Sequence, residues 1–376
     1  MRYLDEFRDP RLAADRLSRI RRTAKRVWTL MEVCGGQTHS LVRHGIPEAL
    51  AGCVELIHGP GCPVCVTSEA LVDRAQALAR QPETLLTTFG DMLRVPGTYG
   101  TLLDARRDGG NVQSVASPLD AVELAQRNPH FQVVFFAVGF ETTVPASALA
   151  VLQASERRIE NFSLLVAHVR VQPAMELLLQ QADCRVQGLL AAGHVCTVVG
   201  YETYNSLVSA YGVPIVVTGF EPVDLLEGIL ACVVQLETHS ARLENCYART
   251  AKLQGNPVAQ QLIASVFEPC DRAWRGLGTI PAGGWKLRAP WRSFDAERRF
   301  PQAPVGLPIV KALSHRCRAS DVLVGRLAPR DCPEFGGSCR PDSPLGAPMV
   351  SSEGACAAYY HHAPSPPHRV PSQDES

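Results

Sequence analysis

The strongest constraint on the fold is a series of short, almost continuous apolar runs separated by amphipathic stretches of helical length. Such runs are typical of strands that are covered on both faces, as in parallel sheets. Their alternation with helical patterns predicts an α/β protein. The predicted strands span residues 27–33, 54–58, 84–89, 133–138, 163–169, 186–191 and 214–218.

Helix starts follow several of these runs. Ser117 supplies an N-cap hydroxyl before a proline, and further helices are expected to begin near Glu69 and Pro222. The sequence Gly-Phe-Glu-Thr at residues 139–142 is echoed by Gly-Phe-Glu-Pro at residues 219–222. This echo suggests two similar α/β halves, although ordinary strand-to-helix turn chemistry would produce it too.

The patterns therefore predict two similar parallel-sheet α/β domains followed by a cysteine-rich C-terminal region. We expect the first domain at residues 1–145 and the second at residues 146–265. Residues 266–362 begin with a segment rich in proline, glycine and tryptophan, which predicts a linker, and continue into the cysteine-rich part. Residues 363–376 have the composition of a disordered tail.

Charge and hydropathy exclude several classes of partner. Lysine plus arginine and aspartate plus glutamate number 37 each, so no net charge draws the chain to nucleic acid or an anionic membrane. The longest apolar run, residues 133–140, is far shorter than the about 18 residues of a membrane span. The N-terminus has no pattern of a signal or transit peptide. We expect a cytoplasmic protein, in which thirteen cysteines favour metal ligation or redox chemistry over structural disulfides.

The first candidate site is the sequence Cys-Gly-Gly-Gln-Thr-His that runs from Cys34 to His39, where a predicted strand ends and a helix begins. Unpaired amides at the helix N-terminus are expected to lower the pKa of Cys34. His39 follows about one helical turn later and could share a metal or a proton with Cys34. The alternative is a buried cysteine that packs as a small apolar residue.

The second candidate site is the C-x-x-C unit of Cys62 and Cys65, which also follows an apolar run. This spacing brings two sulfurs within reach of a disulfide or of a common metal. Thioredoxin-like chemistry and half of a zinc site both use it, so the spacing alone does not choose between them.

The third candidate site is a set of four cysteines near the C-terminus. Four soft ligands suit a [4Fe-4S] cluster or an all-thiolate zinc site, but their spacing matches neither ferredoxin runs nor the close pairs of zinc sites. Glu353, beside Gly354, is interpreted as a group that supports the cluster region or its electron path, or else as a solvated loop carboxylate. The four cysteines are Cys317, Cys332, Cys339 and Cys356.

The other cysteines occur singly in apolar or helical settings and are interpreted as core or incidental residues. His194 follows a glycine at a strand end and is interpreted as a satisfied core histidine. The single cysteines are Cys53, Cys184, Cys196, Cys232, Cys246 and Cys270.

Taken together, these motifs resemble the HypD family of [NiFe]-hydrogenase maturation factors. The resemblance rests on residues 34–39, 59–65, 139–143 and 349–360, in this order, and covers nearly the whole chain. The chain departs from the family in having Ala319 where a C-x-C is common, and Pro348 before Met349. Neither position belongs to the four-cysteine pattern.

The resemblance implies a scaffold with redox activity, not a turnover enzyme. It implies a HypC-type chaperone and a HypE-type cyanide donor as partners, and assembly of a transient Fe(CN)2(CO) unit that serves the hydrogenase large subunit indirectly. Cys34 matches the family's iron-binding thiol, His39 its nearby histidine, and Cys62 and Cys65 its essential pair. The family's C-x14-C-x6-C-x16-C pattern matches the four C-terminal cysteines as ligands of a [4Fe-4S] cluster.

The leading hypothesis is that the Cys34 thiolate, shared with a cysteine of the partner, holds iron while diatomic ligands are added. Electrons would come from the cluster, through the Cys62/Cys65 disulfide or directly to iron. The alternative is a stand-alone iron-sulfur thiol-disulfide oxidoreductase. A nucleotide-binding α/β enzyme ranks last, because the chain lacks G-x-G-x-x-G after a strand and G-x-x-x-x-G-K-[ST].

Overall fold

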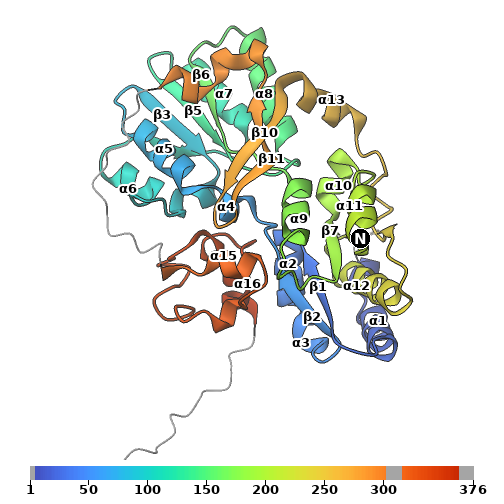
Figure 1. Cartoon of the computed structure of the whole chain (residues 1–376). Helices are drawn as coiled ribbons and strands as arrows, with labels where there is room; N and C mark the ends of the chain where they lie inside the picture. Colours follow the sequence, from blue (N-terminus) through green and yellow to red (C-terminus); the bar gives the residue numbers. More distant parts are fainter. Residues whose placement is uncertain (1–4, 302–315, 364–376) are drawn as a thin grey trace, which may run out of the picture.

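Two parallel sheets form the body of the protein, which confirms the predicted α/β class (Figure 1). The computed structural model describes residues 5–301 and 316–363. Across the first sheet the strands are β2 (Val54–His58), β1 (Trp28–Glu32), β7 (Gly188–Ala192), β8 (Ile215–Thr218) and β9 (Leu243–Asn245). Across the second sheet they are β4 (Val112–Ser114), β3 (Thr84–Thr88), β5 (Gln132–Ala137) and β6 (Phe162–Val166).

All seven predicted strands are present, because each has the apolar run that burial on both faces requires. The sequence patterns missed β4 and β9, which have three residues each and are too short to show a period.

The predicted helix starts at residues 69, 118 and 222 are confirmed by α5, α7 and α12. The Ser117 hydroxyl and the Asp120 carboxylate form a capping box at the start of α7. The helices are α1 (Pro10–Thr23), α2 (Gly35–Arg43), α3 (Ile46–Ala49), α4 (Pro63–Val66), α5 (Glu69–Ala79), α6 (Leu102–Arg107), α7 (Pro118–Arg127), α8 (Val144–Glu156), α9 (Val171–Leu179), α10 (Gly193–Val199), α11 (Tyr204–Tyr211), α12 (Pro222–Glu237), α13 (Pro257–Val266), α14 (Ala296–Arg299), α15 (Ala319–Leu323) and α16 (Ala355–His362).

The first sheet buries apolar side chains on both faces. Leu30 and Val216 pack with α1 and α12 on one face. Met31 and Val217, one residue further along the same strands, pack with α9, α10 and α11 on the other face. Successive residues of a strand point to opposite faces, so a strand covered twice must be apolar throughout.

The second sheet is built in the same way. Leu86 and Phe136 face α5 and α6, whereas Phe135 and Leu164 face α7, α8 and α13. The two sheets are therefore separate parallel-sheet cores of one chain.

The strand pairing corrects the predicted boundary at residue 145. β1 and β2, from the expected first domain, pair with each other and, through β1, with β7, from the expected second domain. β6, which also lies beyond residue 145, pairs with β5 in the second sheet. The reason is packing: α9 follows β6 in the chain, but its residues Val171 and Met175 pack in the core of the first sheet. Apolar runs reveal where strands lie but not which strands pair.

The expected linker is corrected as well, because it contains an antiparallel hairpin of β10 (Phe267–Trp274) and β11 (Gly278–Leu287). Phe267 and Leu287 pack in the core of the second sheet. Trp274 and Ile280, near the turn, pack in the core of the first sheet. The hairpin therefore ties the two cores together.

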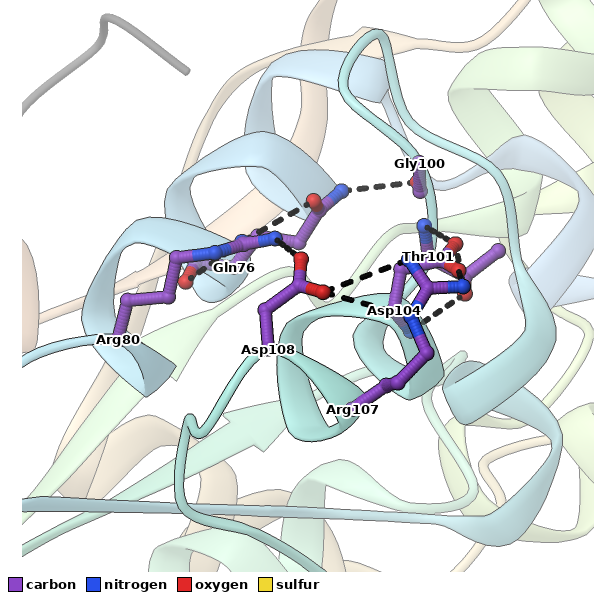
Figure 2. A network of polar contacts seen from close by, with 7 residues as sticks. All are labelled: Gln76, Arg80, Gly100, Thr101, Asp104, Arg107 and Asp108. Carbon is purple, nitrogen blue, oxygen red and sulfur yellow. Dashed lines mark hydrogen bonds and ion pairs between the residues drawn. The ribbon is translucent and has the colours of Figure 1, made fainter. Parts of the chain in front are cut away.

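A polar network on the second sheet's side of the molecule fixes α6 against α5 (Figure 2). Thr101 and Asp104 form a capping box at the start of α6. The buried Gln76 of α5 donates to the carbonyl of Gly100 at 2.9 Å, and Arg80 pairs with Asp108 at 3.2 Å. Exposed ion pairs contribute little, so the cap and the buried glutamine supply most of the stabilisation.

The cysteine-rich segment carries α15 and α16 and lies beside α2 and α4 in Figure 1. Except for residue 363, the expected disordered tail lies outside the described residues. Among the helices of residues 5–301 and 316–363, none combines the length and the apolar character that a membrane crossing requires.

Candidate functional site

Cys34 lies at the predicted junction between the end of β1 and the start of α2. It is the N-cap residue of α2 in an extended conformation, and its side chain is 1% exposed. The backbone N–H groups of Gly36 and Gln37 lower the pKa of its thiol, although its side chain makes no capping hydrogen bond. The helix N-terminus therefore offers donors to this thiol, as expected.

The acidity of Cys34 differs from the prediction. Burial raises the pKa of the Cys34 thiol, and the carboxylates of Glu32 and Glu353 raise it further. The backbone donors lower the pKa but do not outweigh the loss of hydration. The free thiol is thus protonated at neutral pH, and a thiolate needs a cation to replace the proton.

The nearest histidine to this thiol is His194. Its Nδ1 lies 3.6 Å from Sγ of Cys34, and its ring tilts against Phe220 at 5.2 Å. Burial lowers the pKa of His194 to about 4, so the ring is neutral at neutral pH. The interpretation as a core histidine missed this contact. The signal in the sequence is Gly193-His194 at the end of β7, since β7 is the parallel neighbour of β1.

His39 points to the C-terminal segment. Its Nδ1 lies 3.1 Å from the carbonyl oxygen of Ser352 and donates to it. Its ring meets the ring of His362 edge-on, with centroids 4.7 Å apart. The structure therefore pairs Cys34 with His194 and pairs His39 with the segment that precedes and includes α16.

The turn that leads into the C-x-x-C unit packs on the backbone of Cys34 through Gly61. Cys62 and Cys65 are joined as a disulfide and are 3% and 1% exposed. The Gly35 N–H donates to the carbonyl of Gly61 at 2.9 Å. A Cβ at Gly61 would overlap the nitrogen and Cα of Cys34, so only glycine allows this approach. A bonded pair favours thiol-disulfide chemistry over a zinc half-site.

The four C-terminal cysteines gather around α16. Cys356, at the start of this helix, interacts electrostatically with the other three sulfurs. Burial raises the pKa of Cys317, Cys339 and Cys356. The fourth sulfur belongs to Cys332, which the structure brings to the same place.

Backbone donors and close packing surround this group of sulfurs. The Leu345 N–H donates to Sγ of Cys339 at 3.4 Å, and a Cβ at Gly346 would overlap the sulfur of Cys317. Amides that point at sulfur are typical of such sites. Within the described residues no three His, Cys, Asp or Glu side chains converge on a single metal ion. A [4Fe-4S] cluster binds one thiolate at each of its irons, so its four ligands would not converge on a single metal ion.

Glu353 interacts with Cys34, and it is not among the groups that shift the pKa of the three C-terminal cysteines whose pKa is raised. A Cβ at Gly35 would overlap the backbone oxygen of Glu353, so the two segments touch. Desolvation by the surrounding segments raises the pKa of Glu353, although much of its surface is exposed. The carboxylate of Asp91 adds to this rise and His39 opposes it. Glu353 thus interacts electrostatically with both Cys34 and His39.

Glu32 is a functional candidate that the sequence patterns did not single out. It is fully buried at the end of β1 and accepts from the Cys34 N–H at 2.9 Å. It also accepts from the Thr38 hydroxyl and, at 2.8 Å, from Nδ1 of His58. A buried carboxylate in an otherwise apolar strand was the signal available in the sequence.

Comparisons with known proteins identify the family of this chain. The family model HypD, described as "Hydrogenase formation hypA family", matches residues 11–363. The hydrogenase maturation factors HypD of Rhodobacter capsulatus and Escherichia coli are 44% and 43% identical to this chain, over 96% of it and 98% of each relative. The HypD of Azotobacter vinelandii is 45% identical over 96% of both chains. The chain belongs to the HypD family.

Proposed function

We propose that this protein acts in the maturation of [NiFe]-hydrogenase by holding, on Cys34, the iron that becomes the Fe(CN)2(CO) unit. The observation that carries the proposal is the pairing of a buried thiol and a neutral imidazole 3.6 Å apart, on the ends of neighbouring parallel strands. The names of the relatives point to the same process.

The chemistry of Cys34 suits a carrier. Thiolates donate strongly to a low-spin iron that must also bind cyanide and carbon monoxide. Because burial keeps the free Cys34 thiol protonated, the proton leaves only when iron takes its place. The neutral ring of His194 offers an imidazole nitrogen at the same point.

The partners are proposed from the family. A HypC-type chaperone would share the iron through a cysteine of its own, and a HypE-type protein would supply cyanide. The hydrogenase large subunit would receive the product indirectly. The absence of a net charge agrees with partners that are proteins and not nucleic acid. The free cysteines of this chain suit a reducing cytoplasm.

The four C-terminal cysteines fit a [4Fe-4S] cluster, and we propose that they hold one. When bound, such a cluster supplies one-electron transfer. The chain's own two-electron group is the Cys62–Cys65 disulfide, which takes up two electrons and two protons when it opens to two thiols. Gly61, next to this pair, touches the Cys34 backbone, and we infer that this contact couples the redox state of the pair to Cys34.

Infrared spectroscopy tests the proposal. The protein would be purified anaerobically with its chaperone partner, and the cyanide and carbonyl bands compared in the wild type and in Cys34→Ala. We expect the bands to vanish in Cys34→Ala while the iron and sulfide of the four-cysteine site stay. Cys184→Ala, at a partly buried thiol in another part of the chain, is the matched control. A Cys34→Ala protein with full cyanide bands would show that another residue holds the iron.

The disulfide also permits the second candidate function, a stand-alone thiol-disulfide oxidoreductase. Turnover would need access to Cys62 or Cys65, but both are buried. Cys62→Ala and Cys65→Ala should therefore block maturation and leave the reduction of a small disulfide reagent unchanged. Steady turnover that depends on these two cysteines, without any partner, would favour the second function.

A further inference from the structure

A buried chain of hydrogen bonds runs from Cys34 to α16. Glu32 accepts from the Cys34 N–H at 2.9 Å and from Nδ1 of His58 at 2.8 Å. On its other side, Nε2 of His58 lies 3.0 Å from the hydroxyl of Tyr359. Tyr359 is three residues after Cys356 on the same helix. The chain therefore joins the iron-binding residue to the helix that carries a cluster cysteine.

The hydrogen-bonding chemistry fixes how His58 joins its two partners. A carboxylate only accepts, so Nδ1 of His58 donates to Glu32, and the opposite ring nitrogen, Nε2, is left to bond with the Tyr359 hydroxyl. Glu32 and His58 are 0% and 3% exposed, so bulk water does not reach the hydrogen bond between them. A buried carboxylate needs all of its hydrogen-bond donors, because a buried carboxylate oxygen without a donor lowers the stability of the fold. The position of Glu32, and with it the Cys34 N–H, thus depends on His58 and Tyr359.

A second contact joins the same two segments. The backbone of Glu353, just before α16, touches Gly35, the first residue of α2. The segment around α16 therefore holds the Cys34 loop at two points, one on each side of Cys34 in the sequence. A small cavity of about 50 Å³ lies beside His58 and Tyr359, at the contact of β2 with the segment after α15.

We propose that Tyr359 and His58 are positioning residues for Cys34, which fix the iron-binding loop to the helix of the four-cysteine site through Glu32. The proposal rests on the proposed function only for the role of Cys34 as the iron ligand. If a hydrogen bond of this chain is removed, the Cys34 loop becomes more mobile while the four cysteines keep their places.

Alkylation of Cys34 tests the positioning without any cargo. The full-length protein, purified without its partner, would be labelled with iodoacetamide, and the Cys34 peptide quantified by mass spectrometry. Tyr359→Phe removes one hydroxyl and should speed labelling about five-fold, the factor that one neutral hydrogen bond supports. Since a water in the neighbouring cavity could replace the hydroxyl, His58→Asn is the second variant: an asparagine can still donate to Glu32 but cannot reach Tyr359.

The double variant shows whether the two residues act as one chain. If they do, Tyr359→Phe added to His58→Asn should change the labelling rate no further. Tyr360→Phe is the matched control, because Tyr360 is 39% exposed and packs its ring on Phe335. Thermal unfolding of all variants reports any general loss of the fold.

Infrared bands of the iron-loaded complex give a readout that a merely structural role would not move. We expect Tyr359→Phe to shift or broaden the cyanide bands at unchanged cluster iron. If the wild type has no bands, the proposed function fails and the alkylation test still stands. Wild-type labelling rates in Tyr359→Phe and His58→Asn overturn the inference. Faster labelling of Cys34 in His58→Asn alone also overturns it, since the hydrogen-bonded chain would then end at His58. Equally fast labelling in Tyr360→Phe overturns it as well.

Discussion

Replacing the buried Glu141 with glutamine should make the protein more stable at alkaline pH than at acidic pH, relative to the wild type. Glu141 follows β5 and is 4% exposed. One carboxylate oxygen accepts from the Val171 N–H at 3.0 Å, and the other has no partner among the described residues. Burial raises the pKa of Glu141 from 4.5 to about 7, although the Val171 N–H and Arg170 lower it.

The sign follows from proton linkage. Below pH 4.5 the Glu141 carboxyl is protonated in both the folded and the unfolded chain, so it adds no pH dependence to the free energy of unfolding. Between pH 4.5 and about 7 the unfolded chain releases the proton and the folded protein keeps it, so stability falls as the pH rises. At about 1.4 kcal/mol per pH unit the full loss amounts to about 3 kcal/mol.

Glutamine is neutral at every pH and its amide oxygen keeps the hydrogen bond from Val171. We expect the free energy of unfolding of Glu141→Gln to exceed that of the wild type by about 2–3 kcal/mol more at pH 8 than at pH 5. Urea unfolding of both proteins at a series of pH values measures this difference. Glu156→Gln, at an exposed position of α8, controls for the substitution itself. A difference that stays constant between pH 5 and pH 8 would refute the reasoning.

Three further outcomes follow from the site. Gly61→Ala should lower the free energy of unfolding by about 1–3 kcal/mol, because its Cβ overlaps the Cys34 backbone; Gly90→Ala, in open space, should not, and thermal unfolding compares them. Cys339→Ala should remove the brown colour and the bound iron and sulfide, whereas stoichiometric zinc in the anaerobic wild type would contradict this. Glu353→Gln removes a carboxylate that raises the pKa of Cys34, so alkylation should reach half-rate at lower pH; an unmoved profile would free Glu353 of this role.

The parallel strands were predictable because burial on both faces leaves a direct trace in the sequence, as in β5 and β1. The hairpin of β10 and β11 left no such trace. Its inward residues pack in two different cores, Trp274 and Ile280 in one and Phe267 and Leu287 in the other, and proline and glycine interrupt its pattern. Sheet membership was not predictable either, because α9 packs on a sheet other than the one it follows.

The candidate site was predictable where one segment carries the chemistry, as at Cys34 and at the C-x-x-C pair. Partners from other segments were not. The nearest histidine in sequence, His39, faces Ser352, and the histidine at the thiol is His194, 160 residues away. The carboxyl ends of neighbouring parallel strands meet at one edge, so this contact depends on the pairing of β1 with β7.

The environment of Cys34 distinguishes between two functions for this residue, that of an iron carrier and that of the reactive thiol of an oxidoreductase. The thiolate is the nucleophile in disulfide exchange, so a thiol with a raised pKa reacts slowly at neutral pH. Gly61, directly before the disulfide of Cys62 and Cys65, touches the Cys34 backbone, and a more acidic thiol at Cys34 would be better suited to exchange with a disulfide. Burial keeps Cys34 out of that reaction until a cation displaces its proton. The same desolvation that opposes nucleophilic chemistry therefore agrees with the proposed role of this residue as a metal ligand.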